Sequence, residues 1–115
     1  MTDTIWAAVR ACRTALDEAN GLDRQELTCR VLKVAEEAGE AAGAWIGVLG
    51  QNPRKGVTHT PAEVAGELAD VALAALIAIE SLGFDAREVL DRCAGKVGAR
   101  LASAGGNPEV PVTPV

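Results

Sequence analysis

Residues 64–79 limit most strongly what this chain can fold into, because they are apolar or small on every side of a helix. The only charges among these sixteen residues are Glu67 and Asp70. A helix that is apolar all round is normally enclosed by neighbouring helices. The chain as a whole holds 22 Ala against one Phe, two Trp and no Tyr, and Ala favours helices over strands. We therefore expect an all-α protein with a core of small side chains.

Apolar spacing and turn signals predict four helices. The first predicted helix ends at Asn20-Gly21. The second begins at Asp23 with Glu26 and ends at Gly50. The third begins at Thr60-Pro61 with Glu63 and ends at Gly83, and the fourth begins at Asp85 with Glu88. Short connections favour a four-helix bundle. We expect one helical domain over residues 1–102 and a disordered tail, rich in Gly and Pro, over residues 103–115.

Charge and length exclude some partners. A net charge of −5 opposes nucleic-acid binding, which needs clustered Lys and Arg. The longest uncharged apolar run, residues 71–79, is too short to cross a membrane. Three cysteines without a Cys-x-x-Cys pair predict buried, reduced thiols and a cytoplasmic protein; they are Cys12, Cys29 and Cys93.

Self-association is expected on two grounds. A small domain with an Ala-rich core gains little from burial alone. In addition, Gly39, Gly43 and Gly47 recur every four residues within one predicted helix, and each costs about 1 kcal/mol relative to Ala. Such a ridge suggests close packing against another backbone, most simply across the interface of a homodimer or homotetramer.

Carboxylates on two helices are the candidate functional groups. Glu67 and Asp70 lie three residues apart and hence on nearly one face of an apolar helix. Burying them costs on the order of several kcal/mol per ion without a positive partner. No Lys or Arg lies within that segment, and Mg²⁺ readily takes carboxylate ligands. On the preceding helix, Glu37 and Glu40 share one flank of the apolar stripe, whereas Glu36 points away from it.

Two simpler interpretations compete with a metal site. In the first interpretation, the glutamates of the second helix form a solvated face, and Lys33, four residues before Glu37, makes a surface ion pair. In the other, Glu67 and Asp70 pair with Arg or Lys from another helix or subunit. A non-catalytic helical interaction protein would then be the alternative to an enzyme.

The pattern Glu36-Glu37-x-x-Glu40 followed by Glu67-x-x-Asp70 resembles the signature of the MazG-like all-α nucleoside triphosphate pyrophosphohydrolases. The likeness spans roughly residues 27–101. It implies a helical homo-oligomer that hydrolyses a nucleoside triphosphate to the monophosphate and pyrophosphate, as part of nucleotide-pool housekeeping. A related enzyme of similar architecture, phosphoribosyl-ATP pyrophosphohydrolase, is the alternative activity.

The resemblance implies Mg²⁺, with Mn²⁺ as a substitute, held by Glu37, Glu40, Glu67 and Asp70. Glu36 is a candidate to take the proton of the attacking water. Basic residues should face the phosphates, and Lys96 with Arg100 resembles the basic pair on the family's last helix. The remaining candidates are Arg92 on the same stripe, Arg54 and Lys55 in the predicted loop, and Trp6 and Trp45 for stacking on the base, although core packing is favoured for Trp45.

Overall fold

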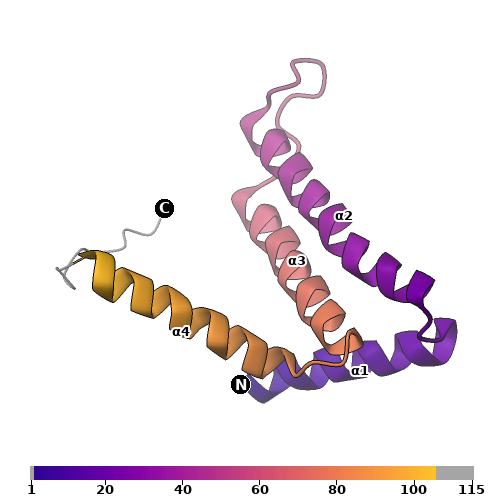
Figure 1. Ribbon diagram of the computed structural model, residues 1–115. Coiled ribbons are helices and arrows are strands. Elements are labelled where there is room, and N and C mark those ends of the chain that lie inside the picture. The colour runs from indigo at the N-terminus through magenta and orange to yellow at the C-terminus, as the bar shows by residue number, and fades with distance from the viewer. Residues whose placement is uncertain (1, 106–115) are drawn as a thin grey trace. The chain divides into compact units, whose positions relative to one another are not determined.

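The computed structural model describes residues 2–105, and four α-helices account for most of them (Figure 1). The helices are α1 (Thr2–Asn20), α2 (Arg24–Leu49), α3 (Pro61–Ser81) and α4 (Ala86–Gly105). No strand occurs within this part of the chain, so the prediction of an all-α protein is confirmed. Nor does any helix in it have the length and apolar character needed to cross a membrane.

The helix ends follow the predicted capping residues. The Asp23 carboxylate accepts a hydrogen bond from the backbone N–H of Glu26 at 2.8 Å. Thr60 and Glu63 form a reciprocal capping box, and α2 ends at Gly50, which is left-handed with φ +63°. At its other end α4 continues to Gly105, three residues beyond the predicted domain boundary at 102. The rest of the predicted tail, residues 106–115, lies outside the described residues.

The chain divides into two compact units, one containing α1, α2 and α3 and the other containing α4, and each is described by itself. In the first unit α2 and α3 run antiparallel and side by side, joined by residues 50–60, and α1 packs against α3 (Figure 1). Four helices are therefore confirmed. The packing of all four into one bundle stays a prediction.

Small side chains form the contact between α2 and α3. Ala41 and Ala44 are buried on α2 and Ala78 is buried on α3. Because such residues let two backbones approach closely, larger apolar side chains are left beside the contact. Trp45 is 49% exposed and Leu68 is 55% exposed, so the prediction that Trp45 packs in the core is wrong for the single chain.

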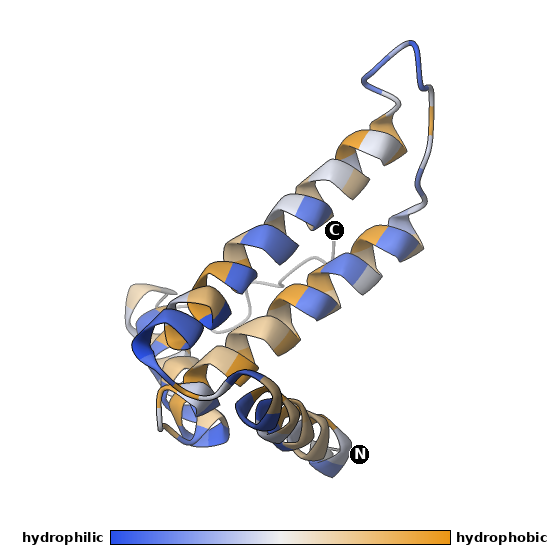
Figure 2. Cartoon of the chain, turned by 90° about the vertical axis from the view of Figure 1, so that its right-hand side faces the viewer, coloured by the Kyte–Doolittle hydropathy of each residue, from blue (hydrophilic) through white to orange (hydrophobic). Residues whose placement is uncertain are grey.

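The enclosure predicted for α3 is also absent in the first unit. Glu67 is half-buried and Asp70 is exposed, whereas the part of this helix that follows them, residues 71–79, is apolar throughout (Figure 2). Burial therefore comes mainly from one neighbouring helix rather than from all sides. The three cysteines are exposed as well, so the prediction of buried thiols is wrong.

The glycine ridge of α2 has one close contact within the chain. A Cβ atom at Gly47 would collide with the side chains of Thr58 and His59, and the Thr58 N–H donates to the Gly47 carbonyl at 2.9 Å. Nothing described lies within 4 Å of the equivalent position at Gly39 or Gly43. Gly47 thus packs against a loop of its own chain, whereas an interface at the other two glycines stays a prediction.

Candidate functional site

Glu37 lies on the contact between α2 and α3, which determines what it can reach. It precedes the buried Ala41 and Ala44 by four and seven residues, the spacing of one helix face, and its side chain is 14% exposed. Glu67 is half-buried on α3, at the corresponding spacing before Val71 and Ala74. The two glutamates therefore face each other across the helix pair.

Five carboxylates form two overlapping groups around Glu37. In one group, oxygens of Glu36, Glu37 and Glu40 lie within 4.8 Å of one another. In the other group, oxygens of Glu37, Glu67 and Asp70 satisfy the same limit. The structure thus brings together all five carboxylates that the sequence nominated. Glu36 is exposed, in line with its predicted direction away from the apolar stripe, and one of its oxygens still approaches Glu37 and Glu40.

The donor set suits a hard divalent cation. All the ligands are carboxylate oxygens, which Mg²⁺ prefers, and two oxygens bound to one Mg²⁺ lie at most about 4.2 Å apart. Within each group the oxygens lie within 4.8 Å of one another, which is slightly above this value. Glu37 belongs to both groups and could bridge two ions or serve one.

The negative charges of this cluster act on one another. The Glu37 carboxylate raises the pKa of Glu40 above its ordinary value, and burial and the Glu67 charge act in the same direction. Among residues 2–105, no Lys or Arg lies within ion-pair distance of Glu40, Glu67 or Asp70. The cluster therefore carries more negative charge than its described neighbours neutralise.

Lys33 neutralises the outer part of the cluster. Its ammonium nitrogen lies 3.3 Å from a carboxylate oxygen of Glu36 and 3.3 Å from one of Glu37. Hydrogen bonds to Glu36 and then Glu37 raise the pKa of Lys33. The surface pair considered from the sequence is therefore present, but it engages only two of the five carboxylates.

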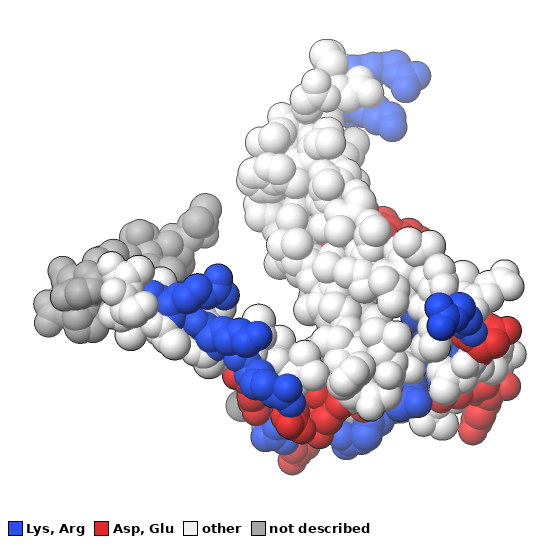
Figure 3. All heavy atoms as spheres, viewed as in Figure 1, with Lys and Arg blue, Asp and Glu red and all other residues white. Residues whose placement is uncertain are grey.

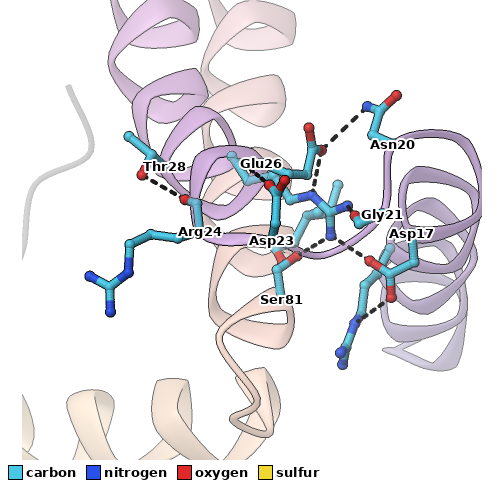
Figure 4. Close-up of polar contacts among 11 residues, drawn as sticks. Asp17, Asn20, Gly21, Asp23, Arg24, Glu26, Thr28 and Ser81 are labelled. Atoms are coloured by element: carbon cyan, nitrogen blue, oxygen red, sulfur yellow. Dashed lines mark hydrogen bonds and ion pairs between the residues drawn. The ribbon is translucent and has the colours of Figure 1, made fainter.

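A buried arginine missed by the sequence analysis supports the other end of α2. The Arg30 side chain is 4% exposed and ties three elements together (Figure 4). It donates to Asp17 of α1 at 2.6 Å, to Glu26 at 2.8 Å, to Ser81 of α3 at 3.1 Å and to the Gly21 carbonyl at 3.0 Å. We call this set the Arg30 cluster. The spacing of Glu26, Arg30 and Glu37 along one helix face was the available signal.

A cavity of about 560 Å³ extends from the carboxylates toward α1. Glu37 and Asp70 line it at one end, and Leu16 and Asn20 of α1 line it at the other. Lys33 and Arg30 lie between them on α2. The predicted metal site therefore opens into a space that is large enough for a small organic ligand.

The predicted phosphate-binding residues do not join the carboxylates within the first unit. Arg54 and Lys55 lie in the loop beyond Leu49, which is about 18 Å along the axis of α2 from Glu37 at 1.5 Å per residue. Arg92, Lys96 and Arg100 are exposed on α4, where Arg92 pairs with Glu88 at 2.7 Å. Figure 3 shows basic side chains along α4 and at the loop. Phosphate binding by the α4 stripe stays a prediction.

The two predicted stacking residues do not line the cavity. Trp6 is half-buried on α1. Trp45 instead lines a separate apolar groove of about 520 Å³ between α2 and α3, together with residues that include Val64 and Leu68. The lining of the cavity therefore does not support the prediction that either tryptophan stacks on a base.

Comparison of the chain with models of protein families, with curated proteins and with solved structures found no match in any of the three.

Proposed function

We propose that this chain is a Mg²⁺-dependent pyrophosphohydrolase that converts nucleoside triphosphates to monophosphates and pyrophosphate, in the manner of the MazG-like family that its motifs resemble. One observation carries the proposal: Glu37 belongs to two groups of carboxylates contributed by α2 and α3. The same five residues make up the sequence pattern of the resemblance.

Electrostatics supports a cation at this site. Several carboxylates lie within 4.8 Å of one another, and like charges at such distances repel. Lys33 balances only Glu36 and Glu37. A divalent ion answers the remaining charge and matches the all-oxygen donor set. A non-catalytic partner that supplies arginines is the competing explanation.

The residues have distinct roles in this proposal. Glu37, Glu40, Glu67 and Asp70 would hold Mg²⁺, or Mn²⁺ in its place. Bound metal would neutralise phosphate charge and make water a better nucleophile. Glu36 is exposed at the edge of the cluster, and in this proposal it would accept the proton that the attacking water loses.

Release of pyrophosphate from a panel of nucleoside triphosphates, with Mg²⁺ and with EDTA, tests the proposal. Phosphoribosyl-ATP belongs in the panel because it is the substrate of the alternative enzyme. We expect release that requires the metal, and we expect Asp70→Asn to abolish it because a neutral oxygen replaces a charged ligand. Asp91→Asn, an exposed change on α4, is the control. Activity in EDTA, or full activity of Asp70→Asn, would overturn the metal assignment.

Self-association as a homodimer or homotetramer is part of the same proposal. The groove between α2 and α3 is lined by apolar residues alone, including Ala38, Trp45 and Leu68. One face of this helix pair is almost free of charged side chains (Figure 3). A second copy of the chain would remove these apolar side chains from water. The cytoplasmic location also stays a prediction.

A further inference from the structure

The cavity beside the carboxylates is elongated, and different residues line its two ends. Glu26, Arg30, Lys33 and Glu37 line it from α2, and the rise from Glu26 to Glu37, eleven steps along the helix, is about 16 Å. Since α3 runs antiparallel, Asp70 meets the Glu37 end. The acidic groups of the candidate metal site are therefore at one end of an elongated space.

Aliphatic side chains become more frequent away from that end. Leu16 of α1 and Leu73, Ala74 and Ile77 of α3 line the remaining part, together with Cys29, Glu26 and Arg30 of α2 and Asn20 of α1. Aliphatic walls suit the faces of a planar heterocycle and offer nothing to a phosphate. A phosphate group held by a metal ion at the carboxylates would thus leave the organic end of a ligand against these aliphatic side chains.

The polar groups at the α1 end differ in their availability. Arg30 already donates to four acceptors, Asp17, Glu26, Ser81 and the Gly21 carbonyl, so four of its five N–H donors are engaged. Asn20 donates from Nδ2 to Glu26 at 3.3 Å, and its Oδ1 has no partner among residues 2–105. The exposed Asn20 amide therefore keeps an acceptor for a ligand.

We infer that the aliphatic part of this cavity binds the nucleoside of the substrate, with the base between Leu16 and Ile77 and with Asn20 as a specificity-determining residue. The inference rests on the proposed function, because that function places the phosphates at Glu37 and Asp70. It replaces the tryptophans expected from the sequence with aliphatic side chains and one amide.

Filling the cavity tests the inference. Leu16→Trp places a bulky ring in the nucleoside position, whereas Thr14→Trp adds the same ring about 200° around α1, at an exposed residue. The probe is an α,β-methylene nucleoside triphosphate with Mg²⁺, whose binding is followed by calorimetry. We expect Leu16→Trp to weaken binding by about tenfold or more and Thr14→Trp to leave it unchanged. Ala74→Leu narrows the same space from α3, should weaken binding in the same direction, and serves if Leu16→Trp does not fold.

Measurements of turnover distinguish a contact of Asn20 with the base from a structural role of Asn20 in the fold. Asn20→Leu should change the ratios of kcat/KM among the four ribonucleoside triphosphates by roughly three- to tenfold, the value of one hydrogen bond. A merely structural asparagine would lower all four equally. Unaltered ratios would overturn the role of Asn20.

The two proposals fail differently. If the wild-type chain releases pyrophosphate and the cavity-filling variants bind and react like wild type, the cavity inference falls and the proposed function stands. If no triphosphate is hydrolysed but the probe binds and Leu16→Trp prevents it, the hydrolase proposal falls and the nucleoside site stands. A wild-type chain that neither reacts nor binds the probe overturns both.

Discussion

Replacing Arg30 by Met should destabilise the first unit, because Arg30 joins α1 to α2 and α3. Met keeps an unbranched side chain in the same place but removes the charge and all four hydrogen bonds of the Arg30 cluster. Asp17 and Glu26 would then lose their common cation. Since Leu16 and Asn20 of α1 line the cavity, a looser α1 would also reshape the predicted nucleoside site.

The expected magnitude follows from the exposure of the three charged groups. Removing one partner of a fully buried ion pair costs about 3–5 kcal/mol, because the other charge is left buried. Here the Arg30 side chain is 4% exposed, but Asp17 is 30% and Glu26 is 16% exposed, so both acids regain some water. We therefore expect the free energy of unfolding to fall by about 2–3 kcal/mol, or roughly 10–20 °C in Tm for a unit of this size.

Urea and thermal unfolding followed by circular dichroism measure this effect. Arg24→Met is the matched control, because Arg24 is exposed on the same helix and its side chain points away from the cluster (Figure 4). The control should change the unfolding free energy by less than about 0.5 kcal/mol. Equal stability of Arg30→Met and wild type would refute the reasoning, since the cluster would then carry no net energy.

Three further predictions concern charge, metal and assembly. The hydrogen bond from Arg30 holds the pKa of Asp17 below its ordinary value of 3.8, so this stabilisation is present above that pH and is lost as pH falls through the lowered pKa. Asp17→Asn should therefore be less stable than wild type at about pH 7, with a gap that narrows as pH falls through the lowered pKa of Asp17. In thermal unfolding, Mg²⁺ at about 100 times its Kd should stabilise wild type by about 2.7 kcal/mol. It should not stabilise Glu37→Gln, whereas Glu18→Gln, the control, should respond like wild type. In light scattering, Trp45→Glu should dissociate the oligomer, whereas Val57→Glu, a change in the loop, should not.

Each of these predictions has a contrary result. A constant gap between wild type and Asp17→Asn across the acid range would mean that the ion pair does not stabilise the fold. Stabilisation of Glu37→Gln by Mg²⁺ would move the metal away from the shared carboxylate. A monomeric wild-type chain would remove the case for self-association.

Local signals in the sequence predicted the helices and their ends well. Caps such as Asp23 and Thr60 act through hydrogen bonds within three residues, so their effect does not depend on the rest of the fold. The same locality explains why the i, i+3 pairs of acids were recognised. Glu67 and Asp70 share a helix face whatever packs against it.

Tertiary structure decided what those faces meet. The contact between α2 and α3 passes through Ala41 and Ala44 rather than through Trp45, because small side chains let the backbones approach. With this face of α2 in the contact, Glu37 points toward α3, the acidic pairs of the two helices come together, and Trp45 stays outside the contact. The hydrogen bonds from Arg30 to Asp17 and Ser81 are likewise non-local, since they join residues 13 and 51 positions apart in the sequence. Helical periodicity is a property of neighbouring residues, whereas the facing of two helices depends on side-chain volumes along the whole contact.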